Sequence, residues 1–599
     1  MLELASVVFG GLFPLLVACA LGMIAFRQTP MPFVVRFGIG AAIESLMVFL
    51  LLLAGWARWP VFLGGGLIAL GLLYWIRPKA HDHTPAITPL DRASFYILLA
   101  VFATYSALYL VHALAPEIQP DAITYHLGLV SEYVRLGRFP HRIGFYEMVP
   151  QGLEMLFSVA FAFGGHSAAK LVHFAFLAAT VPLVLSIGRQ LNLSDRVSLV
   201  AAALYLCAPV VGVSGTCAYN DAAFVFFVLA AFYFLLARQW APAGIAAGFC
   251  FAIKVNGLLI APIAVLAAWL IGRRIRAPLL VAAAALTMIA PWMVRDAVLT
   301  GNPVAPLFNR VFPNPYFRVD MERHLAATLG SYSGFQWTSA PMEYIVGGNL
   351  QGTIGPAFFL LPIGLLALRN RAGRLIWAAA AVALAPWLWN VGARFLMPAL
   401  PFLALAIAMT LPKPLAWACL IVQAVACLPA LTARYESSSA WKLEGWPWRA
   451  ALRLEPEHVY LDRQVPAYKL ARVVEKNTRT GDRIFDLAGI ANAYTTREVV
   501  SYWHSAQANQ LTDALAATLT AIRFPQVAMS FRWQATTLRR LRFRTASPGP
   551  NEWRLFDVNL FSDGSRVFIC PQWSIKAFPN SWETLLALDE NRATFWSSW

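Results

Sequence analysis

The sequence is dominated by long apolar runs, and these runs constrain its fold more than any other feature. A helix that spans a membrane needs about 17–25 mostly apolar residues. Fourteen runs, some of them short, are candidate spans: 4–26, 34–56, 60–76, 93–115, 168–188, 197–214, 221–237, 241–253, 255–272, 277–299, 353–368, 375–390, 394–411 and 415–432. With 59% hydrophobic and 13% charged residues, a soluble enzyme with water on all sides is excluded.

Lys and Arg in the short loops predict the orientation of these helices. Cytoplasmic loops retain an excess of Lys and Arg. If the 77–92 loop is cytoplasmic, alternation places Arg189, Arg273 and Arg371 on the same side. This alternation requires that 152–166, a short apolar stretch, lies at the membrane interface or re-enters rather than spanning. Basic loops also explain the net charge of +16, and the sequence has no basic run with interleaved aromatic residues, so we expect no nucleic-acid binding.

The chain divides into three predicted parts. Residues 1–92 are additional N-terminal transmembrane helices, and 93–433 are a transmembrane core with outside loops at 116–167 and 300–352. Residues 434–599 have a soluble composition, in which GDRIFDLAG and SRVFICP predict strands while PAYKLARVVEKN and QLTDALAATLTAIR predict amphipathic helices. We therefore expect a polytopic α-helical membrane protein with a small extracytoplasmic C-terminal α/β domain.

Two acidic residues lie beside apolar segments on the predicted outer side, where charge is costly and therefore informative. Asp121 follows a proline, with Tyr125 and His126 one turn further on. Asp221 opens a predicted span just after Tyr219. Either carboxylate could simply cap a helix. Two carboxylates facing one outside chamber are more than capping requires, although helix starts supply such pairs by chance, so both interpretations stay open.

Three cations lie on the same predicted side, against the positive-inside trend. Lys254 separates two apolar runs, Arg295 ends a predicted span and Arg394 begins one. Each could extend to the lipid headgroups or pair with a carbonyl at a helix end. Cations next to carboxylates could instead hold a lipid-linked phosphate while an acid or base acts beside it.

Five segments, in this order, resemble the GT-C superfamily of membrane glycosyltransferases, in particular bacterial relatives of protein O-mannosyltransferases and lipid A aminoarabinose transferases. They are PDAITYHLGLVSEYVRLGRF, AYNDAAFVFFVLAAFYFLL, GIAAGFCFAIKVNGLLIAP, APWMVRDAVLTGNPVAPLF and ARFLMPALPFLALA, within about residues 95–410. The resemblance implies a GT-C-like fold in the bacterial inner membrane. It also implies transfer of a sugar from a polyprenyl-phosphate donor, on the outer face, to a lipid, glycan or protein acceptor.

The same resemblance assigns expected roles to the candidate residues. Asp121 corresponds to a general base or acceptor-positioning group in the first outside loop, and Asp221 to a second acidic position. The resemblance implies donor-phosphate contacts from Lys254 and Arg394. We also expect a third cation in this role and three aromatic residues that position the substrate. The cations are Lys254, Arg394 and Arg295, and the aromatic residues are Tyr125, His126 and Tyr219.

The chain also departs from the family pattern. Three extra helices precede the usual first one, Asp121 is followed by Ala122 rather than by a second acid, and Asp221 has no clear second carboxylate nearby. A divalent cation therefore remains only a possible cofactor. Two other functions stay open, namely a transporter or flippase of a lipid-linked substrate, and a catalytically silent scaffold subunit of a membrane complex. A transporter would favour internal repeats, and none is visible between the two halves of the chain.

Overall fold

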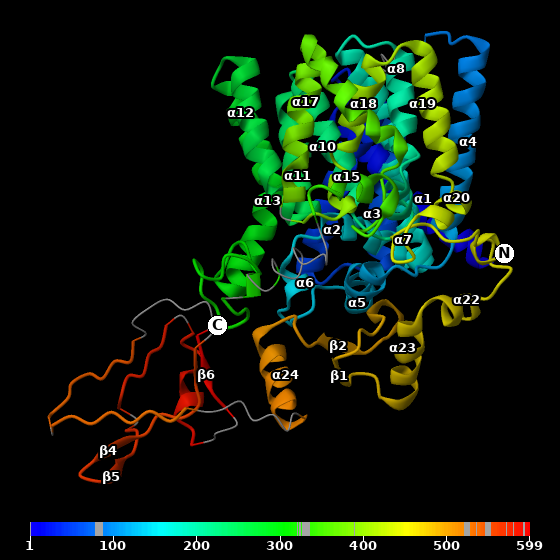
Figure 1. Cartoon of the computed structure of the whole chain (residues 1–599). Helices are drawn as coiled ribbons and strands as arrows, with labels where there is room; N and C mark the ends of the chain where they lie inside the picture. The colour runs from blue at the N-terminus through cyan, green and yellow to red at the C-terminus, as the bar shows by residue number, and fades with distance from the viewer. Residues whose placement is uncertain are drawn as a thin grey trace.

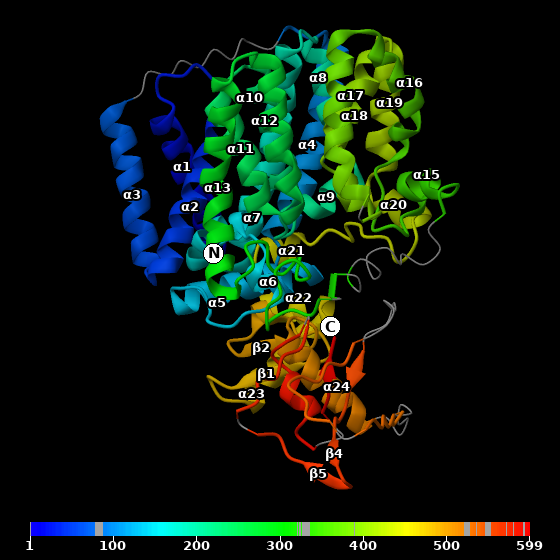
Figure 2. The same ribbon diagram turned by 90° about the vertical axis from the view of Figure 1, so that its left-hand side faces the viewer.

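The helices form one bundle, and the C-terminal elements lie together beyond one end of it (Figure 1, Figure 2). The structure is a computed structural model. It describes residues 2–77, 88–319, 321–322, 325, 336–388, 390–519, 527–534, 536–544, 553–570, 572–578, 580–590 and 594–598.

The bundle contains helices of very different lengths. The first group is α1 (Leu2–Ala25), α2 (Phe33–Ala54), α3 (Trp59–Ile76), α4 (Arg92–Leu114), α5 (Leu127–Leu136), α6 (Phe145–Met148), α7 (Gly152–Gln190), α8 (Asp195–Leu206), α9 (Pro209–Gly215), α10 (Asp221–Leu236), α11 (Trp240–Ile253), α12 (Ile260–Gly272) and α13 (Arg276–Thr300). The second group is α15 (Ala340–Met342), α16 (Leu361–Gly364), α17 (Arg371–Leu384), α18 (Leu400–Thr410), α19 (Lys413–Ala426) and α20 (Pro429–Tyr435). Short π or 3-10 turns are η1 (Ala122–His126), η2 (Val255–Leu259), η3 (Glu343–Gly347), η4 (Pro356–Leu360), η5 (Leu365–Arg369), η6 (Ala385–Leu388) and η7 (Ala393–Leu396).

By length and composition the chain is a multi-pass membrane protein. In its described part, seven helices are long and apolar enough to span, or up to nine if two bent pairs, α8–α9 and α19–α20, each count as one. The predicted count of fourteen is not confirmed. At 1.5 Å per residue, the 16-residue α10 and the 14-residue α11 are shorter than the apolar core of a bilayer, about 30 Å thick.

The predicted non-spanning stretch 152–166 forms the first limb of α7. A 39-residue helix is longer than one crossing needs, and the backbone of α7 kinks at Gly165, where φ is +65°. The limb is therefore separated from the predicted span at 168–188, as alternation requires. Residues 152–160 are buried within the protein rather than exposed on its surface. Its place at a membrane interface stays a prediction.

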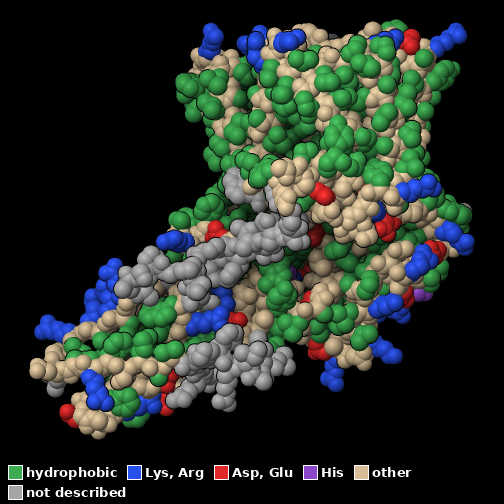
Figure 3. Space-filling view, viewed as in Figure 1, with side chains coloured by type: hydrophobic (Ala, Val, Ile, Leu, Met, Phe, Trp, Pro, Cys, Tyr) green, Lys and Arg blue, Asp and Glu red, His purple; other side chains and the backbone are tan. Residues whose placement is uncertain are grey.

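Side-chain types on the surface differ between the sides of the bundle and its two ends. Figure 3 shows hydrophobic side chains covering the sides of the bundle, with Lys and Arg at the free end. Charges of both signs are found on the C-terminal region at the opposite end. A band of apolar side chains of this kind is what a lipid-facing surface requires. The C-terminal region is therefore on the side away from the basic loops.

The C-terminal region contains helices and small sheets, in keeping with the α/β composition predicted for it. Its elements are α21 (Trp448–Ala451), α22 (Glu457–Gln464), α23 (Pro466–Asn477), β1 (Arg483–Asp486), η8 (Asn492–Tyr494), β2 (Glu498–Ser501), α24 (Ala506–Leu519), β3 (Arg554–Leu555), β4 (Leu560–Ser562), β5 (Ser565–Val567), η9 (Thr584–Ala587) and β6 (Trp596–Ser597). Strands β1 and β2 pair in parallel, whereas β3–β6 and β4–β5 are antiparallel pairs. Predicted strands are thus present at RIFD and SRV, although the sheets are separate and short.

Close packing of α1 against α2 depends on two glycines. A Cβ added to Gly40 would lie 1.7 Å from the carbonyl oxygen of Ala18, and one added to Gly22 would lie 1.9 Å from that of Arg36. Small residues allow membrane helices to approach to backbone contact in this way. Because the obstacles are backbone atoms, no side-chain rotation could make room for a methyl group.

We expect Gly40→Ala to destabilise the protein by about 1–3 kcal/mol, because α1 and α2 must separate to admit the methyl group. Gly65→Ala, on the exposed face of α3, is the matched control, since its Cβ would meet nothing within 4 Å. The control should leave stability unchanged or raise it slightly through helix propensity. Thermal unfolding of the purified variants measures both effects, and equal melting temperatures would contradict the packing argument.

Candidate active site

Four of the predicted charged residues meet at the end of the bundle that faces the C-terminal region. Arg394 donates from Nε to Asp221 Oδ2 and from Nη1 to Asp121 Oδ2, each at 2.7 Å. Lys254 Nζ lies 2.6 Å from Asp221 Oδ1. These four residues, which we call the charged cluster, come from four separate elements of the chain. Two carboxylates are thus bridged by one guanidinium, and a second cation binds the more buried of them.

Irregular backbone positions these side chains. Asp121 directly precedes the π-helical turn η1, and π-helical turns are frequent at functional sites. Lys254 is extended, with φ −153° and ψ 131°, and separates α11 from η2. Arg394 lies in the 3-10 turn η7. Asp221 is the first residue of α10, where the helix dipole favours a negative charge.

The two carboxylates differ in their access to solvent. The side chain of Asp121 is 37% exposed, whereas that of Asp221 is 5% exposed. Ser214 Oγ also donates to Asp221 Oδ2, at 3.0 Å. Asp221 is therefore surrounded by donors and serves to hold the two cations, while Asp121 keeps an open side from which a ligand can approach.

Opposing effects act on the pKa of Asp121. Burial of its surroundings would raise the pKa, but the positive charge of Arg394 and the hydrogen bond from it outweigh burial. The pKa therefore lies below the ordinary value of an aspartate. As long as Arg394 is bound to it, Asp121 stays ionised and is a weak proton acceptor.

Aromatic rings enclose the cations. The guanidinium of Arg394 lies 4.3 Å from the ring centre of Tyr219 and 5.7 Å from that of Trp441. Tyr219 and Trp441 stack on each other with ring centres 5.3 Å apart. Lys254 lies over the ring of Phe395 at 4.7 Å. Rings around a cation exclude water and add cation–π attraction, so these charges interact more strongly than they would in solvent.

Tyr125 and His126 border the charged cluster and also have partners outside it. The side chain of Tyr125 hydrogen-bonds Asp121, which helps to lower the pKa of that carboxyl. Tyr125 stacks on Tyr146 with ring centres 3.7 Å apart. His126 Nδ1 lies 2.5 Å from Glu154 Oε1. The ring of His126 is also 5.6 Å from that of Tyr219. Both residues can therefore shape the site without belonging to the charged cluster.

Arg295 is the one predicted cation that the structure does not bring into the cluster. Its side chain is 3% exposed. Nη1 donates to the backbone oxygen of Glu147 at 2.9 Å and to Asp296 at 3.2 Å, and the guanidinium lies 4.5 Å from the ring centre of Phe139. Phosphate contact by Arg295 therefore has no support in this geometry.

The site also contains residues that sequence reasoning missed. Trp441, Phe395, Ser214 and Glu154 all contact residues that were predicted. Trp441 lies beyond the last predicted span, and no charge or motif distinguishes it from the many other aromatic residues of the chain. Phe395 directly follows Arg394, and this adjacency is the sequence feature that could have indicated a place for Phe395 in the site.

A divalent cation does not fit the charged cluster as arranged. Both carboxylates are engaged by Arg394 or Lys254. Among the described residues, no group of three or more His, Cys, Asp or Glu side chains could hold a metal ion. Divalent cations in protein sites are typically held by several oxygen ligands, so we derive no step that involves one.

The chain was compared with family models, curated proteins and solved structures. No family model matches it, and no curated protein is significantly similar to it. Among solved structures it is similar to ArnT from Cupriavidus metallidurans in the apo state, with 13% identity over 68% of this chain and 86% of that chain, at a TM-score of 0.45. The structure of ArnT from the same organism bound to undecaprenyl phosphate is 13% identical, over 72% of this chain and 88% of that chain, at a TM-score of 0.44. The oligosaccharyltransferase from Archaeoglobus fulgidus in the apo form is 15% identical, over 69% of this chain and 65% of that chain, at a TM-score of 0.38.

All three TM-scores are below 0.5. Identity is low in every case, so the function proposed below rests on the geometry of the charged cluster.

Proposed function

We propose that this protein is a membrane glycosyltransferase that moves a sugar from a polyprenyl-phosphate donor to an acceptor on the outer face of the membrane. The observation that carries the proposal is the bridge that Arg394 forms between Asp121 and Asp221, with Lys254 on Asp221. Such a site combines cations for a phosphate with a carboxylate that can take a proton. Transfer of a sugar from a phosphate leaving group is helped by donors that stabilise the departing phosphate and by a group that takes the proton of the acceptor.

Arg394 and Lys254 would hold the donor phosphate. The bonds to the two carboxylates use Nε and Nη1 of Arg394, so its Nη2 has no hydrogen-bond partner among the described residues. The ammonium of Lys254 has three N–H donors and uses one of them on Asp221. Fixed donors of this kind stabilise the negative charge that develops on a departing phosphate.

Asp121 would act as the general base. When the donor phosphate binds Arg394, it weakens the ion pair to Asp121 and brings further negative charge close to that carboxylate. Both effects raise the pKa of Asp121, so the carboxylate becomes a stronger proton acceptor only when the donor is present. The bond from sugar C1 to the phosphate oxygen breaks, a bond from C1 to the acceptor oxygen forms, and the acceptor proton passes to Asp121.

The same proposal places the reaction in the cell. Basic loops at the far end of the bundle support a cytoplasmic location for that end, so the charged cluster and residues 434–599 would face the outside of a bacterial inner membrane. The transmembrane core at 93–433 would contribute the charged cluster. A donor with a polyprenyl chain would reach Arg394 from the surrounding lipid.

The proposal is tested with the purified protein and a panel of radiolabelled undecaprenyl-phosphate sugars. We expect binding of at least one donor and release or transfer of its sugar, with donor affinity reduced about tenfold or more by Lys254→Gln, because a hydrogen bond to a charged group is lost. Lys413→Gln is the matched control, since Lys413 pairs with Asp91 on an exposed surface. Tight donor binding without turnover would favour a transporter, and no binding of any donor would contradict the proposal.

A further inference from the structure

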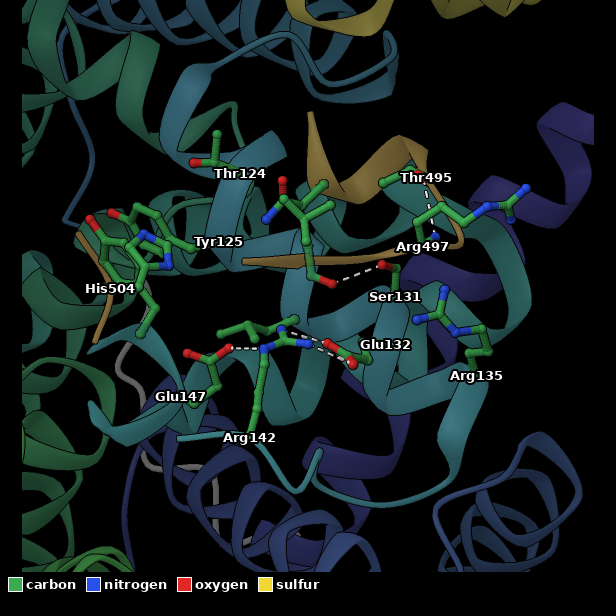
Figure 4. Close-up of a pocket in the computed structure, with 15 residues that line it drawn as sticks. Thr124, Tyr125, Ser131, Glu132, Arg135, Arg142, Glu147, Thr495, Arg497 and His504 are labelled. Atoms are coloured by element: carbon green, nitrogen blue, oxygen red, sulfur yellow. Dashed lines mark hydrogen bonds and ion pairs between the residues drawn. The ribbon is translucent and has the colours of Figure 1, made fainter. Parts of the chain in front are cut away.

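A polar cleft that is open to solvent lies between the first outside loop and the C-terminal region (Figure 4). One wall comes from the segment that contains α5 and α6, including Thr124, Ser131 and Glu147. The opposite wall comes from η8 and β2, including Asn492 and Thr495. The cleft therefore exists only where two parts of the chain more than 300 residues apart meet.

Direct contacts hold these walls together. A Cβ on Gly128 of α5 would lie 2.9 Å from the Cβ of Asn492, so glycine is needed for this close approach. The backbone N–H of Phe145 donates to the backbone oxygen of His504 at 2.7 Å. Arg135 Nη1 donates to the backbone oxygen of Thr496 at 2.5 Å. The cleft is consequently built into the fold rather than left between two loosely placed parts.

Most charges in the cleft neutralise one another. Arg142 lies between Glu132, at 2.7 Å, and Glu147, at 2.5 Å, as Figure 4 shows. Arg497 pairs with Glu475 at 3.1 Å. Burial lowers the pKa of His504 to about 4, so its ring is neutral at neutral pH. A strongly anionic or cationic ligand would find few unpaired counter-charges here.

The cleft instead offers unused hydrogen-bonding groups of both kinds. Asn492 Oδ1 and Glu147 Oε2 are buried acceptors with no partner among the described residues, and the side chain of Glu147 is 5% exposed. Arg135 is exposed, and its described hydrogen bond uses only Nη1. Buried acceptors are costly when unpaired, so a ligand rich in hydroxyl donors would satisfy them. Hydroxyl oxygens would also accept from Arg135.

The cleft adjoins the charged cluster through Tyr125. This residue lines the cleft, packs on Tyr146 and lies four residues, or about one helical turn, after Asp121. Aromatic faces beside hydrogen-bonding groups suit the ring of a sugar, which has an apolar face and a polar rim. A ligand in the cleft would thus have one end close to the carboxylate proposed as the base.

We propose that this cleft is the acceptor subsite and that the acceptor is a carbohydrate, an uncharged saccharide with several free hydroxyls. The inference rests on the transferase function proposed above. In the transfer, a saccharide hydroxyl gives its proton to Asp121, its oxygen bonds to C1 of the donor sugar, and the phosphate leaves with the electron pair of the broken C1–O bond. Residues Asn492, Glu147 and Arg135 orient the saccharide and take no part in bond breaking.

Saccharide binding is measured without any donor, on the full-length protein in lipid nanodiscs, which avoids detergents with sugar headgroups. Saturation-transfer NMR is used with methyl glycosides of glucose, mannose, galactose and N-acetylglucosamine, and with inorganic phosphate and a Ser/Thr peptide for comparison. We expect at least one glycoside to bind, with affinity reduced about three- to tenfold by Asn492→Ala and by Arg135→Gln, because each substitution removes one hydrogen bond. Arg138→Gln, an exposed residue just beyond the same helix, should leave affinity unchanged.

The outcomes separate the two proposals. Glycoside binding that is sensitive to Asn492 and Arg135 but not to Arg138 supports the subsite, whether or not transfer has been observed. Binding of the peptide or phosphate alone, or glycoside binding that neither variant changes, would overturn it. Loss of donor binding or turnover in the donor assay would instead contradict the transferase function. The melting temperatures of the three variants are measured to establish that each variant is folded. Loss of the glycoside signal in a variant then cannot be attributed to unfolding.

Discussion

Replacement of Arg394 by glutamine is expected to reduce sugar transfer by about a hundred- to a thousandfold and to destabilise the protein by about 3–5 kcal/mol. Transfer falls because the donor phosphate loses the guanidinium that holds it, and removal of one fixed donor to a developing anion costs about 10²–10³ in kcat. Stability falls because Asp121 and Asp221 lose the guanidinium between them, and a broken buried pair leaves charge uncompensated. Steady-state transfer and thermal unfolding measure the two effects.

A matched control distinguishes donor contact from general loss of an ion pair. Arg189 binds Asp195 at 2.8 Å in the loop predicted to be cytoplasmic, far along α7 from the kink at Gly165. Arg189→Gln should lower the melting temperature yet leave donor affinity unchanged. If Arg394→Gln affected only stability, with transfer per folded molecule equal to that of the wild type, the assignment of Arg394 to the donor would be wrong.

Asp121→Asn is expected to reduce kcat by about 10²–10⁴, because an amide cannot accept the acceptor proton. Donor affinity should be retained or improved, since the substitution removes a carboxylate that competes with the donor phosphate for Arg394. Asp91→Asn is the control, because Asp91 accepts from Ser94 N at the start of α4 and is exposed. A variant with unchanged kcat would remove Asp121 from the role of base.

The pH profile gives a second readout of Asp121. Its pKa is lowered by Arg394, so in the donor-free protein it remains ionised to lower pH than an ordinary aspartate does, and kcat/KM should show no acid limb from Asp121 in the ordinary range of a carboxyl. In the donor complex the pKa rises, so the acid limb of kcat should lie at higher pH than that of kcat/KM. Coincident acid limbs would contradict the proposed activation by the donor.

The members of the charged cluster could be predicted from the sequence, but their pairing could not. Hydropathy and loop charge place Asp121, Asp221, Lys254 and Arg394 on one side of the membrane, where charge is costly enough to be informative. Arg394 is 273 residues from Asp121 and 173 from Asp221, however, and no local pattern reports contacts over such separations. Arg295 carries the same kind of signal, yet it packs against Phe139 instead.

The predicted count of fourteen membrane spans is not confirmed, because several of the apolar helices are short. Nearly every residue of α10 is buried among other helices, and its composition is as apolar as that of a helix exposed to lipid. A helix that is hydrophobic all round is buried, either in lipid or in a large protein core, and composition does not distinguish the two. Helix length is a separate observation, and α10 and α11 are shorter than the length that a single span ordinarily needs.

Trp441 has a consequence for how this protein could be divided. It follows the last transmembrane segment in the chain, yet its ring stacks on Tyr219 and its Nε1 donates to Gln119 Oε1 at 2.8 Å, so it closes one side of the space around Arg394. Truncation after residue 433 would therefore expose the guanidinium to bulk water. The segment beyond the membrane is not an exchangeable appendage, and a graft of another protein's tail onto this bundle would have to restore an aromatic ring at that place.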